Sequence, residues 1–518
     1  MLAWTIYLSL GTALLLMLLP ERREQWARFL ALGAALGGLV LSASALFQSA
    51  PGSFRTVTRL SWIPTLGIDY HLGADGISLV LVFLTGLAAV AGILFSWNIG
   101  HRPREFFALY LALIGGVYGV FLSFDLFLLF VFYEIAIIPK YFLIAIWGST
   151  RREYAAMKLA LYSFVGSAMV LVGLVAAFVF AGGQTMSLAD LAAHRFPREF
   201  QMWAFPLVFV GFAVLAGLWP FHTWAPTGHV AAPTAASMLL AGVVMKLGAY
   251  GCLRVAMTLF PEGLQPWGFE WLGIGSWRDV FALLAVTGIL YGGMVALVQK
   301  DFKFVIGYSS VSHMGFVLLG LMTLQTIGLT GAVLQMFSHG IVAGLLFAVV
   351  GRMVYDRVHT RHLDDLQPMN LSRGLPFAAV TFTLATLASI GLPGFSGFVA
   401  ELQVLIGAWQ AYPTLAVLTG AGILVGVAYG LRALQRAFFA ERRSCTDGQA
   451  SGSARGAPAQ PPDSPAPLEP ISFPERVGSI LLIAASLAVG LYPDLLLKYI
   501  LPSFNAPWFD GLRGGGLP

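Results

Sequence analysis

Apolar runs of about 20 residues recur along the whole chain, with short polar segments between them. One such run is long enough for an α-helix to cross the hydrocarbon core of a bilayer. The pattern therefore predicts an all-α polytopic membrane protein with about 14 transmembrane helices. The predicted spans lie near residues 2–19, 28–47, 77–97, 106–123, 125–147, 155–181, 203–224, 231–258, 279–298, 303–323, 328–351, 375–410, 415–438 and 477–500.

The seventh and twelfth predicted spans contain helix breakers, in "LWPFHTWAPTGHVAAPTAAS" (218–237) and "GLPGFSG" (391–397). Irregular backbone at membrane depth is tolerated where it lines a hydrated cavity. The breaks lie five spans apart, so we predict two five-helix repeats, spans 4–8 and 9–13. The residues singled out at the breaks are Pro220, His222, His229 and Pro393.

Polar segments suggest where the chain divides. A longer external loop at 48–76 is expected to hold a short β-hairpin, and the Pro-, Ser-, Ala- and Gly-rich segment 441–475 is expected to be a flexible cytoplasmic linker. The predicted divisions are helices 1–3 with the loop (1–105), the first repeat (106–258), the second repeat (279–440), the linker (441–475) and a C-terminal helix (476–518).

Composition agrees with a membrane protein and narrows the function. Of the 518 residues, 58% are hydrophobic and 11% charged, against about 25% charged in soluble domains. The net charge of +5 is small and basic clusters separate the spans, so nucleic-acid binding is not expected. Cys252 in a span and Cys445 in the linker argue against a disulfide framework. The "HTRHLDD" stretch (359–365) lies in a basic loop and is not expected to bind a metal.

Basic residues predict the orientation in the membrane. Twenty of the 30 Lys and Arg residues lie in odd-numbered loops or at the adjoining helix ends, and eight lie on the even side. Cytoplasmic loops carry the excess of Lys and Arg. We therefore expect the odd loops to be cytoplasmic and both termini to be periplasmic.

Five ionisable residues lie near the middle of predicted spans: Glu134, Lys246, His313, His339 and Glu401. Each buried charge costs about 2.5–3.5 kcal/mol on insertion scales. We expect these residues to form a polar row along the membrane plane that carries protons, with the histidines as relays because they titrate near neutrality. The alternative is structural, with hydrogen-bonded histidines and a buried ion pair.

A second charge lies beside Glu134, in "VFYEIAIIPKYFLIAIWG" (131–148). Lys140 follows Glu134 by about 9 Å along a helix and by about 240° of rotation. The two side chains therefore point to different faces of a straight helix, although a kink at Pro139 could bring them closer.

Longer stretches carry a family resemblance. In chain order they are "YAAMKLALYSFVGSAMVLVG", "PFHTW", "APTAASMLLAGVVMKLGAYG", "DFKFVIGYSSVSHMGFVLLG", "FSHGIVAGLLFAVVGRM", "HTRHLDDL" and "LPGFSGFVAELQVL". Over about residues 70–440 the chain resembles the antiporter-like membrane subunits of bacterial NADH:quinone oxidoreductase, respiratory complex I, and among them subunit M.

The resemblance implies a fourteen-helix fold with two inverted five-helix repeats, in a subunit that translocates protons while quinone is reduced elsewhere. It implies no cofactor in this chain, with flavin, iron–sulfur clusters and quinone in partner subunits. The implied partners are other membrane-arm subunits, including neighbouring antiporter-like subunits, in the lipid bilayer of the bacterial cytoplasmic (inner) membrane. The residues at the family's proton-translocation positions are Glu134, Lys158, Lys246, His313, His339 and Glu401.

The chain departs from the family pattern in its first repeat. Leu215 stands where the resemblance implies a lysine that pairs with Glu134, and Thr227 stands where it implies an aspartate. Lys140 is instead an added cation, so we include it among the proton-translocation residues. Either Lys140 replaces the missing lysine as the cation that modulates Glu134, or the first repeat has lost this coupling.

Three functions stay open at this point. The first is a proton-translocating subunit of NADH:quinone oxidoreductase. The second is a subunit of a multisubunit cation/proton antiporter or of a membrane-bound hydrogenase. The third is a non-pumping structural protein, a divergent second copy of subunit M.

Overall fold

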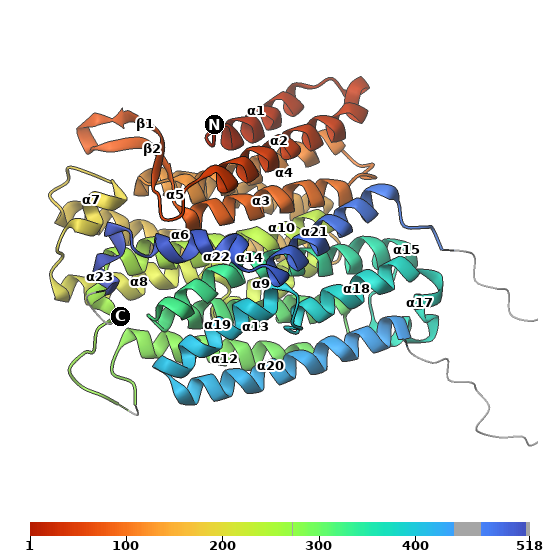
Figure 1. The fold of residues 1–518 in the computed structure, drawn as a ribbon. Helices are drawn as coiled ribbons and strands as arrows, with labels where there is room; N and C mark the ends of the chain where they lie inside the picture. The colour runs from red at the N-terminus through yellow and green to blue at the C-terminus, as the bar shows by residue number, and fades with distance from the viewer. Residues whose placement is uncertain (272, 440–467, 514–518) are drawn as a thin grey trace, which may run out of the picture.

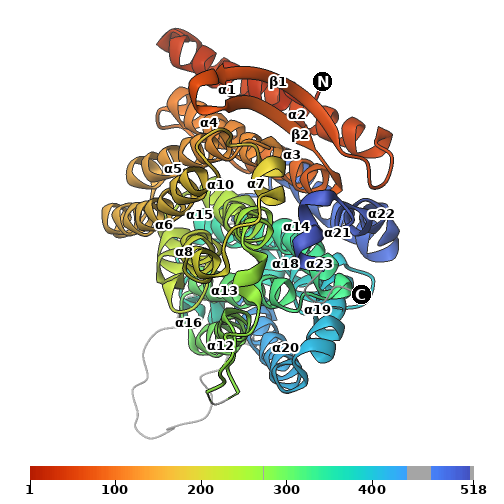
Figure 2. The same cartoon turned by 90° about the vertical axis from the view of Figure 1, so that its left-hand side faces the viewer.

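Long helices form because each apolar run satisfies its own backbone hydrogen bonds, as a bilayer requires. The computed structural model describes residues 1–271, 273–439 and 468–513, and the long helices pack as a bundle (Figures 1 and 2). The longer helices are α1 Trp4–Leu18, α2 Ala27–Gln48, α3 Gly76–Phe95, α4 Pro103–Leu122, α5 Leu126–Trp147, α6 Arg152–Phe180, α8 Arg198–Ala216, α9 Trp224–Ala231, α12 Trp277–Val298, α13 Phe302–Met322, α14 Thr326–Ala348, α18 Pro376–Ser389, α19 Ser396–Ala411, α20 Pro413–Leu434, α21 Phe473–Leu491 and α22 Asp494–Ser503.

Shorter helical segments extend or connect these helices. The α-helical ones are α7 Leu188–Ala193, α10 Thr234–Leu239, α11 Met245–Gly251, α15 Asp356–Val358, α16 Leu363–Leu366, α17 Leu371–Gly374 and α23 Asp510–Arg513. The π-helical ones are η4 Leu240–Val244, η5 Cys252–Met257, η7 Val349–Tyr355 and η9 Gln435–Phe439. The 3₁₀ turns are η1 Glu21–Trp26, η2 Pro64–Leu66, η3 Phe221–Thr223, η6 Pro261–Leu264, η8 Gln367–Met369 and η10 Pro507–Phe509.

The prediction of an all-α polytopic membrane protein is confirmed. Among the described residues, 12 helical segments are long and apolar enough to cross a membrane. Helix α1 and the interrupted pair α18–α19 cover the two other predicted spans, but each of these helices is shorter. The count of fourteen spans and the two five-helix repeats stay predictions.

Two spans were wrongly bounded. The seventh was expected at 203–224, but α8 ends at Ala216 and the chain becomes α-helical again in α9, which ends at Ala231. The last was expected at 477–500, but α21 ends at Leu491 and α22 begins after Pro493. Tyr492 has a non-helical conformation (φ −132°, ψ 76°), because the residue before a proline is disfavoured in the helical region. Of the predicted linker, residues 441–467 lie outside the described residues, and its last three residues belong to α21.

The expected β-hairpin is present between α2 and α3. Strands β1 (Arg55–Ile63) and β2 (Ile68–Ala74) pair antiparallel. The hairpin lies at one end of the bundle, whereas α15 and α17 lie at the other (Figure 1). The Asp125 carboxylate accepts hydrogen bonds from the amides of Asp69 and Leu128, so it fixes the hairpin to the start of α5.

The predicted breaks interrupt two helices. Between α8 and α9 the chain turns at Gly217, with φ of 84°. Between α18 and α19 it turns at Gly391 and Gly394, with φ of 75° and 102°. These left-handed conformations favour glycine, which has no Cβ to clash. At each break one helix ends and the next begins within the bundle, α8 and α9 at the first and α18 and α19 at the second.

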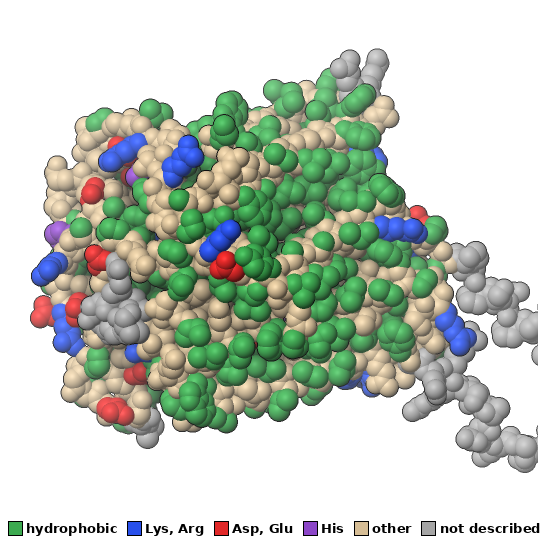
Figure 3. All heavy atoms as spheres, in the orientation of Figure 1, with side chains coloured by type: hydrophobic (Ala, Val, Ile, Leu, Met, Phe, Trp, Pro, Cys, Tyr) green, Lys and Arg blue, Asp and Glu red, His purple; other side chains and the backbone are tan. Residues whose placement is uncertain are grey.

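The surface fits a protein surrounded by lipid. On the face in Figure 3, hydrophobic side chains cover the middle of the bundle and most charged ones lie toward its ends. Helix α6 alone exposes Tyr154, Leu161, Val165, Val172 and Val179 by between 56 and 64%. Exposed apolar side chains in such number are expected where the solvent is a bilayer.

Candidate functional site

Four predicted residues, from four different helices, form one polar row. The Lys246 Nζ lies 2.8 Å from Nδ1 of His339, and the His339 and His313 rings stack with centroids 5.4 Å apart. The row ends where His313 Nδ1 lies 3.2 Å from Glu401 Oε1. All four residues are buried. The structure thus joins Lys246, His339, His313 and Glu401, which the sequence placed only at similar depth.

Local irregularities position both ends of the row. The π-turn η4 precedes Lys246, whose Nζ donates to the carbonyl oxygen of Ala241. π-Turns inside helices occur frequently at functional sites. At the other end, the turn at Gly391 brings its Cα close to the Glu401 carboxylate, so that a Cβ there would lie 2.9 Å from Oε2. The helix break thereby makes room for a buried carboxylate.

Polar neighbours surround the His313–Glu401 end. The Gln335 amide nitrogen lies 3.4 Å from His313 Nδ1 and 3.3 Å from Glu401 Oε1. On the opposite side of the ring, Nε2 lies 3.2 Å from the Ser389 hydroxyl and 3.4 Å from that of Tyr429. Both nitrogens of His313 therefore have partners that can donate or accept a proton.

Two small cavities adjoin this end. One of about 10 Å³ is lined by His313 and Glu401, and the next, of about 20 Å³, shares Tyr429 and Ser389 with it. About 10–15 Å³ is enough for one water. The Thr386 hydroxyl lines the second cavity and is buried without a hydrogen-bond partner among the described residues. Water in these cavities would satisfy it and contact the row.

The first-half residues do not form a comparable row. Lys140 is fully buried, and its Nζ has no hydrogen-bond partner in the part of the chain that the structure describes. Within the same residues no ion pair joins it to Glu134, whose Oε1 is also buried and unpartnered. Tyr133, two turns from Lys140 on the same helix face, packs its ring 5.6 Å from that of Phe212 on α8. Lys140 is therefore buried inside the bundle without a direct contact to Glu134 among the described residues.

Lys158 lies apart from the row. It is half-buried on α6, and its Nζ lies 5.9 Å from the ring of Tyr154, one turn away on the same helix. Helix α6 also packs closely against α8, where the oxygen of Gly211 would lie 2.5 Å from a Cβ on Gly166. Leu215, at the position of the missing lysine, is buried.

The residues at the helix breaks separate into two kinds. Pro220 and Pro393 are exposed in the turns and line no part of the row. His222 and His229 are buried, and among the described residues none of their ring nitrogens has a hydrogen-bond partner. The His229 ring lies 5.0 Å from that of Phe347, two turns along α14 from His339.

Sequence reasoning missed a second buried charge cluster at the hairpin end. The Arg254 guanidinium, in η5, lies 2.5 Å from Oδ2 of Asp75, which caps the start of α3. Arg254 also donates to the Tyr250 hydroxyl and faces the rings of Phe124, Tyr250, Trp508 and Phe509. The count of basic residues assigns Arg254 to the external side, although its position two turns beyond Lys246, within the predicted span 231–258, indicates burial.

Metal binding receives no support from the described residues, since none of them form a group of three His, Cys, Asp or Glu side chains that could hold an ion. The "HTRHLDD" segment instead makes structural contacts. The Arg361 guanidinium lies 2.5 Å from Asp301, the residue that caps α13.

Comparison with known proteins agrees with this geometry. Residues 123–426 match the family described as "NADH:quinone oxidoreductase/Mrp antiporter, TM". NAD(P)H-quinone oxidoreductase chain 4 1 of Synechococcus sp. (strain JA-3-3Ab) is 39% identical over 446 residues, 84% of this chain and 82% of that one. Chain 4-2 of Synechocystis sp. (strain ATCC 27184 / PCC 6803 / Kazusa) is 34% identical over 509 residues, 95% of this chain and 89% of that one.

Solved structures share the fold. A chain of respiratory complex I from Thermus thermophilus with bound NADH superposes with a TM-score of 0.84 and 28% identity, covering 100% of both chains. A chain of the Mrp complex from Dietzia sp. DQ12-45-1b superposes with a TM-score of 0.81, at 22% identity, over 98% of this chain and 99% of that one. The second likeness shows the fold alone. The motifs, the family match and the relatives agree, and the chain belongs to the NADH:quinone oxidoreductase/Mrp antiporter membrane family.

Proposed function

We propose that this chain is a proton-translocating membrane-arm subunit of an NAD(P)H:quinone oxidoreductase in a bacterial cytoplasmic membrane. The row Lys246–His339–His313–Glu401 is the observation that carries this proposal. Flavin, iron–sulfur clusters and quinone would lie in partner subunits, and neighbouring membrane-arm subunits would pack on the exposed apolar faces. Both termini would be periplasmic.

Protons would move along the row by short transfers. The Lys246 ammonium donates to His339 Nδ1, 2.8 Å away, which leaves a neutral amine and an imidazolium. The stacked rings of His339 and His313 have no direct hydrogen bond between them among the described residues, so that step needs a bridging water or a ring rotation. His313 then donates from Nδ1 to Glu401 Oε1, which becomes a carboxylic acid.

For the first half, we infer that Lys140 acts on Glu134 through the electric field of its charge rather than through direct contact. The Lys140 Nζ and the Glu134 Oε1 are both buried and unpartnered among the described residues. Charges interact over several ångströms when the medium between them is weakly polarisable. The alternative is that the first repeat has lost the coupling between a lysine and Glu134. It predicts that Lys140 is dispensable for proton pumping.

Of the alternative functions, a cation antiporter receives less support. The Mrp likeness, at 22% identity, is one of fold, whereas a relative with 39% identity is named as a quinone oxidoreductase chain. A membrane-bound hydrogenase subunit and a non-pumping copy share the same fold expectation, so only transport measurements distinguish them.

The test is proton pumping by the whole oxidoreductase containing this chain, reconstituted in proteoliposomes. Lys246→Met should lower the H⁺/e⁻ ratio, because it removes the first donor of the row. Lys300→Met is the matched control, since the Lys300 side chain is 74% exposed. A wild-type H⁺/e⁻ ratio in Lys246→Met would reject the proposal and favour a structural subunit. Sodium transport without NADH would favour the antiporter.

A further inference from the structure

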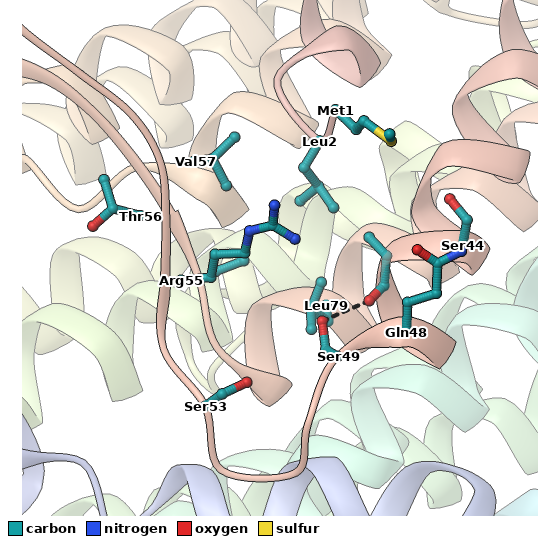
Figure 4. Close-up of a pocket in the computed structure, with 12 residues that line it drawn as sticks. Met1, Leu2, Ser44, Gln48, Ser49, Ser53, Arg55, Thr56, Val57 and Leu79 are labelled. Carbon is teal, nitrogen blue, oxygen red and sulfur yellow. Dashed lines mark hydrogen bonds between the residues drawn. The ribbon is translucent and has the colours of Figure 1, made fainter.

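A pocket at the hairpin end is unrelated to the row. It has a volume of about 210 Å³ and lies where the start of α1, the end of α2 and strand β1 meet, above the beginning of α3 (Figure 4). Its lining is mixed, with the polar Ser44, Gln48 and Ser49 and the apolar Leu2 and Leu79. The cavity is too large for one ordered water.

Arg55 supplies the charge of this pocket. Its guanidinium points into the space between Leu2 and Leu79 (Figure 4). Among the described residues Arg55 has neither an ion pair nor a side-chain hydrogen bond, whereas Arg59 on the same strand is paired with Asp69 at 2.8 Å. One hairpin arginine is thus neutralised within the chain, and the other presents its donors to the cavity.

The surroundings place the pocket beside lipid. Trp4 is 61% exposed and packs edge-on against the half-exposed Tyr7, and Phe47 at the end of α2 is also exposed. Tryptophan and tyrosine are enriched where a bilayer meets water. The pocket therefore opens at the depth of the lipid headgroups, next to helices whose outer faces are apolar.

We propose that this pocket binds the phosphate group of a phospholipid, with Arg55 as the charged anchor. Guanidinium donors match phosphate oxygens in charge and geometry. The polar lining residues suit a headgroup, and the apolar ones suit the glycerol and the first methylenes of an acyl chain. A free phosphate ion would leave these apolar side chains facing a charge, so a lipid is the better occupant.

The binding test uses the whole complex in nanodiscs of phosphatidylglycerol, in phosphate-free buffer, imaged by electron cryo-microscopy. Headgroup density should lie within hydrogen-bond distance of Arg55 in the wild type and in Arg59→Gln, and should be absent in Arg55→Gln. An unchanged β1–β2 hairpin in the same maps shows that the variant is folded. An empty wild-type pocket, equal density in Arg55→Gln, or a side chain of a neighbouring subunit in the pocket would each overturn the proposal.

A second arm identifies the source of the phosphate. The detergent-solubilised complex is titrated with phosphatidylglycerol or with inorganic phosphate, and its thermal stability is followed. Phosphatidylglycerol should stabilise the wild type, with the midpoint moved to roughly tenfold higher lipid in Arg55→Gln, the change expected for loss of one charge-assisted contact. Stabilisation by inorganic phosphate alone would overturn the lipid assignment.

Discussion

At the scale of single residues, the buried cations Lys246, Arg254 and Lys140 differ in their partners. Lys246 has a histidine and a carbonyl oxygen, Arg254 has a carboxylate, and Lys140 has no partner among the described residues. An unpaired buried charge costs several kcal/mol. A residue that remains in such a position without partners is a functional candidate, whereas a well-paired one is a structural candidate.

Lys140→Met tests the functional candidate. Methionine fills a similar volume without the buried charge. The free energy of unfolding should therefore stay the same or rise by about 1–4 kcal/mol, as when other buried ions are replaced by apolar side chains. The H⁺/e⁻ ratio in proteoliposomes should fall, as it should in Glu134→Gln. Full pumping in Lys140→Met together with loss in Glu134→Gln would contradict the inference that Lys140 acts on Glu134.

Arg254→Met tests the structural candidate. It leaves the Asp75 carboxylate buried without its partner, which should cost about 3–5 kcal/mol and lower the thermal unfolding temperature of the complex. Asp75→Asn combined with Arg254→Met should recover part of that loss, since neither charge then stays unpaired. Equal melting temperatures for the single variant and the wild type would show that the ion pair is not needed for stability.

At the scale of elements, helix breaks decide where buried polar groups can lie. The turn at Gly391 lets α18 end inside the bundle and places the Glu401 carboxylate against its backbone. The π-turn η4 frees the carbonyl oxygen of Ala241 from the regular helix pattern so that it can accept from Lys246. Both ends of the row therefore depend on irregular backbone rather than on uninterrupted helices.

Gly391→Ala tests the element at the Glu401 end. An alanine there would adopt φ of 75° and place its Cβ 2.9 Å from Glu401 Oε2. We expect a loss of about 1–2 kcal/mol, seen in thermal unfolding, and a lower H⁺/e⁻ ratio because Glu401 is displaced. Gly420→Ala is the matched control, because no atom lies within 4 Å of a Cβ there. Similar effects in both variants would show that the turn has no special part in the row.

At the scale of the whole molecule, the bundle has two distinct ends. The β-hairpin lies at one end and α15 and α17 at the other (Figure 1). The cluster of Asp75 and Arg254 and the pocket with Arg55 both belong to the hairpin end, whereas Glu475 pairs with Arg352 and Arg357 near the other. Buried ion pairs thus join distant segments close to each predicted membrane surface.

Labelling of single cysteines tests which end is external. In a cysteine-free background, Ser61→Cys on strand β1 should react with a membrane-impermeant maleimide in intact spheroplasts. Arg373→Cys in α17 should react only after lysis, because the excess of Lys and Arg predicts a cytoplasmic position for that segment. Both positions are exposed, so access to the thiol is not limited by burial. The reverse pattern would invert the proposed topology.

The sequence by itself predicted the approximate positions of the spans, the hairpin and the two breaks, and placed Glu134, Lys246, His313, His339 and Glu401 near the middle of their predicted spans. These features follow from local hydropathy and from proline and glycine, which act over a few residues. Tertiary structure alone decided which groups meet. Lys246 and His339 are 93 residues apart, and Arg254 and Asp75 are 179 apart. Their contacts depend on how helices rotate and pack against one another, which hydropathy does not encode. The same packing leaves Lys140 and Glu134 without a direct contact among the described residues, although only six residues separate them.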